Sequence, residues 1–230
     1  MRSIVIMHKQ KISEQRGIGM VSDRSRDRLI QRLRDEGITQ EDVLKVMRKM
    51  PRHIFIQEAL ASRAYEDTAL PIGCKQTISQ PYIVAKMTEI LLQEPVLDKV
   101  LEVGTGSGYQ AAVLSAFVGK LYSVERHKKL VSSAKQRFRK LGIRNVLSVH
   151  GDGYLGWAEK GPFDAIILTA APEQVPETLY TQLKEGGVLL APVGTTEVQN
   201  LVRYRRVGSQ LQREVMGQVL FVPMLKGVEQ

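Results

Sequence analysis

The sequence predicts an α/β fold: a doubly wound, mostly parallel sheet of seven strands, preceded by a helical region. Three observations support this. From residue 96 onwards, short apolar runs alternate with amphipathic helical segments, as in parallel sheets whose strands are connected by helices. A glycine-rich turn at residues 104–108 joins one such run to a helix. Acidic side chains follow the carboxyl ends of several strands, where sites in such folds lie.

The composition is that of an ordinary globular protein, with 230 residues, 43% of them hydrophobic and 25% charged. This length suits one α/β domain with additions. No apolar run approaches the ~18 residues of a membrane-spanning helix, and the apolar patch at residues 1–7 lacks the features of a signal peptide. Because Cys74 is the only cysteine, no internal disulfide can form, and a reducing cytoplasm is expected.

The net charge of +9 comes from 33 Lys and Arg against 24 Asp and Glu. Such a surplus is found in proteins that bind nucleic acid, where contacts to phosphates supply affinity. A solvated basic surface explains it better here, and we expect no nucleic-acid partner. Residues 1–20 show no clear periodicity and are expected to form a flexible arm.

Residues 21–95 are expected to form an N-terminal helical region that packs on the main domain. The helical patterns cover residues 22–36, 39–50, about 56–61, and 82–92. Gly37 ends the first helix, Thr39 is expected to cap the second, and Pro51 follows the end of the second. Residues 65–73 show no regular pattern and are expected to be a crossing loop.

The segment 76–82 carries polar, small and proline residues directly before the helix 82–92. Taken alone, Ser79 fits best as the cap of that helix, because serine is strongly preferred there and Pro81 suits a first helical turn. The alternative is ligand binding, because hydroxyl and N–H groups converge at a helix N-terminus. The two roles are compatible.

The glycine-rich turn carries the clearest sign of a ligand. The strand 96–103 runs into Gly104, Gly106 and Gly108 and then into a helix at about 110–117, as in nucleotide-binding turns. Glu102 precedes the glycines; such an acid repels phosphate but suits a cationic ligand. Glu125 ends the next strand about twenty residues on, the usual reach to a ribose diol. Together these features indicate a positively charged nucleoside without phosphate, S-adenosylmethionine, within a core domain at 96–230.

The alternation continues to the C-terminus. Further strands are expected at 121–124, 146–149, 163–170, 188–193, 201–206 and 215–222, and further helices at 128–141 and 176–183. The last two strands show the alternation of half-exposed antiparallel pairing, and their order in the sheet stays open. Asp152 stands after a strand, where a carboxylate can accept the exocyclic amine of adenine; a turn Asp before Gly153 explains it equally well.

Several motifs in order carry a specific resemblance. The segments LEVGTGSGYQ, SVER, HGDG, FDAIILTAAP and LKEGGVLLAPVG follow the motifs of class I S-adenosylmethionine-dependent methyltransferases, which have a Rossmann-like fold. LPIGCKQTISQPYIVAKMTE, the N-terminal helices and GQVLFVPML narrow this to the bacterial type of the protein-L-isoaspartate O-methyltransferase family. The chain resembles that family from about residue 20 to 227.

The resemblance implies an enzyme that methylates the free α-carboxylate of L-isoaspartyl residues in damaged proteins and peptides, leaving S-adenosylhomocysteine. It implies that Ser79, the serine of the TIS tripeptide, is the active-site residue and that no metal takes part. The residues implied to bind the cofactor are Thr77, Ile78, Ser79, Gln80, Glu102, Gly104, Gly106, Gly108, Glu125, Asp152 and Gly153. Thr77 to Gln80 would close over both cofactor and substrate.

The chemistry fits these residues. A carboxylate with a pKa near 4 is ionised at neutral pH and needs no general base, so catalysis rests on orientation in a water-poor cleft. We expect Ser79 to position the acceptor as a hydrogen-bond donor and not to act as a nucleophile. Two alternatives remain, a nucleic-acid methyltransferase and a scaffold without activity. Residues 168–172 lack the Asn/Asp-Pro-Pro-aromatic motif typical of the former, and the intact glycines and acids argue against the latter. With no apparent dimerisation stripe, a monomer is expected.

Overall fold

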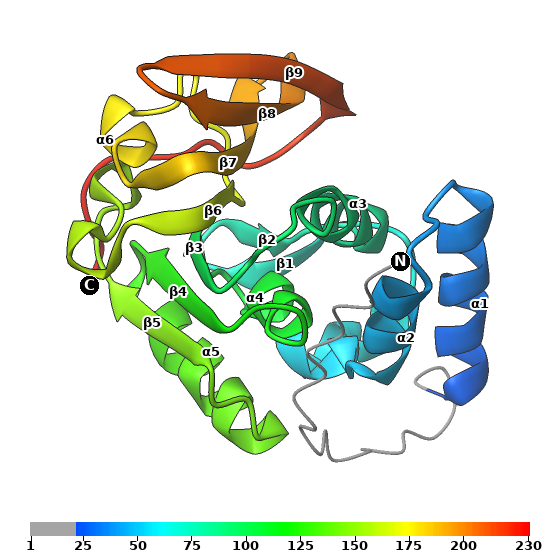
Figure 1. The fold of residues 1–230 in the computed structure, drawn as a ribbon. Helices are drawn as coiled ribbons and strands as arrows, with labels where there is room; N and C mark the ends of the chain where they lie inside the picture. The colour runs from blue at the N-terminus through cyan, green and yellow to red at the C-terminus, as the bar shows by residue number, and fades with distance from the viewer. Residues whose placement is uncertain (1–21) are drawn as a thin grey trace.

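The computed structural model describes residues 22–230, so the predicted arm at residues 1–20 lies outside the described residues. Its centre is a seven-stranded sheet (Figure 1), which confirms the predicted fold class. The strand order is β5 (Val146–His150), β4 (Lys120–Glu125), β3 (Lys99–Val103), β6 (Phe163–Leu168), β7 (Leu183–Gly194), β8 (Gln199–Val207) and β9 (Gln210–Val219).

The pairing of the strands determines where a site can lie. The pairs among β5, β4, β3, β6 and β7 are parallel, whereas β7–β8 and β8–β9 are antiparallel. The chain winds outwards from β3 in both directions, so β3 and its neighbours form the topological switch point, where open α/β sheets bind ligands. The order β7-β8-β9 also answers the question that the sequence left open.

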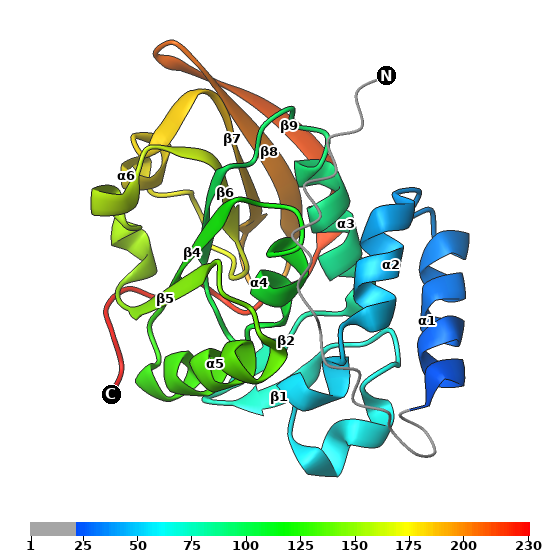
Figure 2. The ribbon, with the colours of Figure 1, turned by 60° about the horizontal axis from the view of Figure 1, so that its bottom comes forward.

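Helices cover both faces of the sheet (Figure 2). The elements α3 (Pro81–Leu91), α4 (Tyr109–Leu114) and α5 (Lys128–Leu141) lie on one face, and α6 (Glu177–Tyr180) lies on the other. Alternate residues of the strands point to the two faces: Val100 and Leu121 join the core under α3 to α5, while Leu101 and Tyr122 join the core under α6. No helix within residues 22–230 is long and apolar enough to span a membrane.

The N-terminal helices α1 (Asp23–Asp35) and α2 (Glu41–Lys49) form an additional layer next to α3. The expected capping by Thr39 is wrong, because Gln40 is the N-cap of α2 and no side chain on that residue caps the helix. The buried Glu89 of α3 instead holds the two residues before the helix: its Oε1 accepts bonds from the Thr39 N–H (2.7 Å), the Thr39 hydroxyl (2.8 Å) and the Gln40 N–H (2.9 Å). A carboxylate fifty residues away thus ties α2 to the helix that follows the TIS segment.

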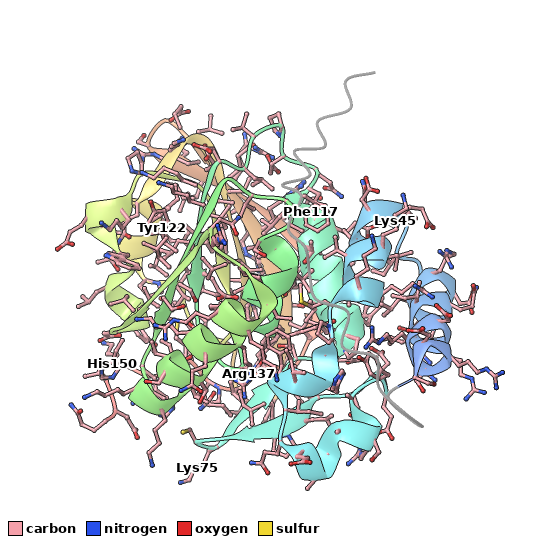
Figure 3. All side chains as sticks on the ribbon, turned by 90° about the horizontal axis from the view of Figure 1, so that it is seen from below. Lys45, Lys75, Phe117, Tyr122, Arg137 and His150 are labelled. Carbon is pink, nitrogen blue, oxygen red and sulfur yellow. The ribbon has the colours of Figure 1, made fainter. Side chains whose placement is uncertain are left out.

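The loop expected at residues 65–73 is in part a hairpin, so that expectation is wrong. Strand β1 (Leu70–Gly73) pairs antiparallel with β2 (Gln76–Ile78), which carries Thr77 and Ile78. Cys74 and Lys75 make the turn with φ angles of 53° and 55°, the left-handed values that hairpin turns require. Neither is a residue type that favours such angles, so the sequence carried no turn signal. Lys75 lies at the outer tip of the hairpin in Figure 3.

Other differences concern the ends of elements. The helix expected at 176–183 is only the four-residue α6, because β7 already begins at Leu183, which pairs with Phe163. The last strand ends at Val219, and the chain then crosses to Ala171, whose N–H donates to the Val222 carbonyl. The helix expected near residues 56–61 is the 3-10 helix η3 (Glu58–Arg63), which follows another, η2 (Arg52–Phe55). Two further 3-10 turns are η4 (Gly153–Leu155) and η5 (Ala158–Lys160).

Candidate functional site

A cleft with about 810 Å³ of empty volume lies at the carboxyl ends of β3, β4 and β6. The glycine-rich turn, the β2 strand with the TIS segment, and residues 222–225 of the C-terminal segment all line it. Seven of the residues that the sequence predicted line it: Thr77, Ile78, Ser79, Gly104, Gly106, Glu125 and Gly153. This is the first cleft.

The glycines of the turn have separate structural roles. Gly104 has φ of 101°, and a Cβ on it would lie 2.3 Å from the Thr169 hydroxyl oxygen, which donates to the Gly104 carbonyl. Gly106 lines the cleft, and its N–H points to Glu125. Gly108, with φ of 88°, is the N-cap of α4 and does not line the cleft; a Cβ there would meet the Phe138 ring at 2.9 Å. The first two thus shape the binding surface, and the third permits helix packing.

Glu125 organises the turn from the end of β4. Its Oε2 accepts a bond from the Gly106 N–H (2.8 Å), and its Oε1 accepts one from the His127 N–H (2.9 Å). The residue is only 5% exposed, yet it lines the first cleft. Each carboxylate oxygen keeps a second lone pair, so Glu125 can accept hydrogen bonds from a ribose diol while it holds the turn.

Glu102 does not line the cleft but lies beneath the turn, completely buried. The Ser123 hydroxyl donates to its Oε2 (2.6 Å) and also lies 2.6 Å from the Thr105 hydroxyl, which does reach the cleft. Burial raises the pKa of Glu102 to about 8, opposed in part by the Ser123 bond and aided by the nearby Glu125. Glu102 is therefore mostly uncharged at neutral pH, and it contributes to the site through a chain of hydroxyl groups.

The raised pKa of Glu102 predicts that stability depends on pH. An unfolded Glu titrates near 4.5 and the folded one at about 8, so the folded state binds more protons between these values. The free energy of unfolding should therefore fall as pH rises through this window, on the order of a few kcal/mol for this group. Urea denaturation at pH 5 and pH 8.5 should show a smaller loss for Glu102→Gln than for the wild type. If the free energy of unfolding fell equally in both proteins, Glu102 would not be the group responsible for the pH dependence.

Asp152 and its neighbour Gly153 are placed differently. Asp152 does not line the cleft; its Oδ1 accepts the Tyr154 N–H (2.9 Å) and its Oδ2 accepts the Gly227 N–H (2.8 Å). It thereby fixes η4 and the C-terminal segment. Gly153 lines the cleft, and a Cβ there would lie 2.6 Å from a methyl group of Val103. Asp152, which the sequence predicted to bind the cofactor, thus anchors two segments of the cleft wall through their backbone.

Ser79 lies between the first cleft and a second one of about 780 Å³, and it lines both. Gln80 lines only the second cleft, together with Tyr82 and residues 218–222, which include the end of β9. Ser79 does not cap α3, since Gln80 is the N-cap and makes no side-chain capping bond, so that expectation is wrong. No hydrogen bond within residues 22–230 engages the Ser79 hydroxyl. Its Oγ is therefore available to a ligand.

Sequence reasoning missed the part of the site that comes from the C-terminal segment. Residues 222–225 line the first cleft, as do Thr169, Arg126 and His127. Figure 1 shows this segment running from the end of β9 past the sheet toward β5. The Arg126 guanidinium bonds to the Glu229 carboxylate at 3.2 Å, which holds the segment in place. In the sequence, only the motif FVPML drew attention to this segment. That motif indicated the family but did not indicate that the segment lines the cleft.

The lining of the first cleft fits the adenosyl part of S-adenosylmethionine. The first cleft offers an uncharged wall from Val124 and Met224 for a purine, and Glu125 for a ribose diol. The backbone of Gly104 and Gly106 is open to close approach, since neither carries a Cβ. Within residues 22–230 no group of three or more His, Cys, Asp or Glu side chains is arranged to hold a metal ion.

Comparisons with known proteins agree with this geometry. The family model described as protein-L-isoaspartate(D-aspartate) O-methyltransferase matches residues 24–229. The chain is 57% identical to protein-L-isoaspartate O-methyltransferase 1 of Marinobacter nauticus over 212 residues, which cover 92% of this chain and 96% of the relative. It is 56% identical over 213 residues to the enzyme of the same name from Stenotrophomonas maltophilia R551-3, covering 92% and 94%.

Solved structures give the same result. A protein-L-isoaspartate O-methyltransferase superposes with a TM-score of 0.77 and 33% identity, over 86% of this chain and 65% of that one. A Plasmodium falciparum protein, assigned to the same activity and crystallised with S-adenosyl-L-homocysteine, gives 0.76 and 25% identity over 87% and 98%. The likeness thus extends over nearly all of the described fold. The chain belongs to the protein-L-isoaspartate(D-aspartate) O-methyltransferase family.

Proposed function

We propose that the first cleft holds S-adenosylmethionine, that the second receives an L-isoaspartyl residue of a damaged protein or peptide, and that Ser79 aligns the two. Isoaspartate methylation is the activity of the family to which the chain belongs. The observation that carries the proposal is the position of Ser79, which lines both clefts with a hydroxyl that no residue of the described structure engages.

The acceptor needs orientation and not activation. Its α-carboxylate is ionised at neutral pH, so no base has to remove a proton. The cofactor supplies an electrophilic methyl group when bound. Ser79 donates a hydrogen bond that fixes one carboxylate oxygen, while Thr77 and Thr169, which also line both clefts, help to exclude water. The backbone nitrogen of the next residue attacks the ester carbonyl and expels methanol, a far better leaving group than the oxide of a free carboxylate. The succinimide re-forms in this step, and water opens part of it to normal aspartate.

The remaining site residues divide between direct binding and support. In this proposal Glu125, Gly104, Gly106, Gly153 and the TIS segment contact the cofactor, while Glu102, Gly108 and Asp152 shape the walls. The core at 96–230 binds the cofactor, and the helical region at 21–95 supplies the TIS segment. The shared core of buried residues, which joins α1 and α2 to the sheet, supports treating the two regions as one packed unit.

We also propose a monomer that acts in the cytoplasm and has no nucleic-acid substrate. The single cysteine, Cys74, is free, as suits a reducing compartment. The cofactor and acceptor clefts lie within one chain, so no second copy is needed to complete the site. The sequence LTAAP at the end of β6 replaces the Asn/Asp-Pro-Pro-aromatic motif that base methylation usually needs.

Methyl transfer from radiolabelled S-adenosylmethionine tests the proposal directly. The purified protein should label a peptide with one L-isoaspartyl residue, and it should leave the same peptide with normal aspartate, and an RNA of mixed sequence, unlabelled. The label should be lost in mild base, as expected for a methyl ester. Base-stable labelling of RNA, or equal labelling of the two peptides, would contradict the proposed substrate.

A further inference from the structure

Arg52 is a charged side chain that is buried in the core and bonded to the backbone of Ser79. It belongs to η2, has no exposed surface, and is the largest of the fully buried side chains in the described structure. Burial lowers the pKa of its guanidinium to about 10, with smaller opposing effects from Tyr109 and Asp67. It therefore stays protonated at neutral pH, and its environment must satisfy a buried cation.

The guanidinium is bound by backbone carbonyls and not by a carboxylate. Its Nε donates to the Ala64 carbonyl (3.0 Å), and its Nη2 donates to the carbonyls of Ser79 (2.8 Å) and Thr68 (3.4 Å). These three acceptors come from the end of η3, from the approach to β1, and from the TIS segment. Arg52 thus joins the active-site serine to the helical layer beneath it.

The same guanidinium also packs on a residue that lines the cofactor cleft. It lies 4.8 Å from the centre of the Tyr109 ring, and Tyr109 begins α4 directly after the glycine-rich turn and lines the first cleft. Arg52 therefore contacts both the Ser79 carbonyl and the first residue of the helix that follows the glycine-rich turn.

Asp67 holds the TIS segment from its other end. Its Oδ2 accepts the Gln80 side-chain amide (2.6 Å), and its Oδ1 accepts the Tyr82 N–H (2.7 Å). Arg52 and Asp67 thus both hold residues 79–82, and Arg52 makes the contact to Ser79 itself. A shift of this backbone would move the Ser79 hydroxyl between the two clefts, and alignment errors of about 1 Å can cost 100-fold in rate.

A packing role alone does not explain this arrangement. A buried cation with no paired carboxylate carries a large desolvation cost, which an aliphatic side chain of similar volume would avoid. An aliphatic side chain, however, has no N–H donors with which to hold the three carbonyls. A planar guanidinium presents such donors in a fixed geometry, which the single ammonium group of lysine cannot reproduce.

We propose that Arg52 is a positioning residue for methyl transfer: by holding the Ser79 carbonyl against the layer that supports Tyr109, it sets the place of the Ser79 hydroxyl relative to the cofactor. This rests on the role proposed for Ser79 above. Arg52 touches neither cleft and acts through the serine. It should consequently affect turnover of the isoaspartyl peptide much more than affinity for the cofactor.

A double-mutant cycle of Arg52→Lys and Ser79→Ala separates positioning from general packing. Arg52→Lys should lower kcat for an isoaspartyl peptide about tenfold or more while the Kd of S-adenosylhomocysteine changes less than about threefold. Ser79→Ala keeps the carbonyl but removes the hydroxyl. In that background Arg52→Lys should lower kcat by less than about threefold, because no hydroxyl remains to be placed.

Leu33→Ala is the matched control for lost stability, since Leu33 is a fully buried residue of the same helical layer and reaches neither cleft. At a temperature where both variants stay folded, it should leave kcat near the wild-type value. Additive effects in the cycle would overturn the proposal, as would a kcat for Arg52→Lys equal to that of the control. If Ser79→Ala has full activity, the proposed role of Ser79 fails too; if only the cycle is additive, Arg52 alone is excluded.

A structure of the wild-type protein provides a second test, which does not require any variant to fold. With S-adenosylhomocysteine and an isoaspartyl peptide bound, the Arg52 Nη2 should stay within hydrogen-bond distance of the Ser79 carbonyl. A ternary complex in which this contact is broken would overturn the proposal.

Discussion

Ser79→Ala is expected to lower kcat for an isoaspartyl peptide about 100-fold, the usual cost of one well-placed hydrogen-bond donor in a catalytic site. The hydroxyl lies between the two clefts and makes no hydrogen bond in the described structure, so its loss leaves no protein group unsatisfied. The Kd of the cofactor should change less than about threefold, because Glu125 and the glycine turn are untouched. Steady-state kinetics and calorimetry measure the two quantities.

Ser132→Ala is a suitable control for this variant. Ser132 is exposed on α5, its hydroxyl donates to the Lys128 carbonyl of the preceding turn, and it lines neither cleft. The control should have wild-type kinetics. If Ser79→Ala methylates the isoaspartyl peptide as fast as the control does, Ser79 does not position the acceptor.

Glu125→Ala should weaken cofactor binding about 100-fold, equivalent to about 2.7 kcal/mol. The change removes the acceptor expected for the ribose diol. It also leaves the N–H groups of Gly106 and His127 without their partner in a buried site, at a typical cost of about 1–3 kcal/mol each. Calorimetric titration with S-adenosylhomocysteine measures the affinity.

The control for this second variant is Glu159→Ala, which removes an exposed carboxylate on η5. It should bind the cofactor with wild-type affinity. An unchanged affinity in Glu125→Ala itself would remove Glu125 from the cofactor site, and the first cleft would then need another ligand.

The parts of the fold that the sequence predicted are those in which local pattern and tertiary environment agree. Strands such as 163–168 are buried on both faces and appear as continuous apolar runs, and Gly142 ends α5 as its pattern indicates. The β1–β2 hairpin was missed because its turn uses Cys74 and Lys75, which rarely take left-handed angles.

Capping shows a second limit of sequence reasoning. Thr39 and Ser79 stand where local rules favour N-caps, yet neither side chain caps its helix. Thr39 instead donates to Glu89, a contact that no rule based on neighbouring residues can find. At Ser79 the absence of capping is informative, because a hydroxyl withheld from its own helix is free for a ligand.

The sequence singled out residues of the candidate site, but it did not tell their different roles apart. Motif spacing placed Glu102, Glu125 and Asp152 at one edge of the sheet, but it did not separate them by environment. Only Glu125 lines the cleft; Glu102 is buried beneath it, with its pKa raised to about 8, and Asp152 is bonded to backbone. Contributions from distant segments, such as Arg52 and residues 222–225, follow from the packing of the chain and had no motif of their own.

A crystal structure with S-adenosylhomocysteine and an isoaspartyl peptide tests the central claim most directly. We predict the nucleoside in the first cleft against Glu125, and the isoaspartyl α-carboxylate in the second, with one oxygen about 3 Å from the Ser79 hydroxyl and facing the sulfur. A nucleoside bound outside the first cleft, or a carboxylate beyond hydrogen-bond reach of Ser79, would contradict the account.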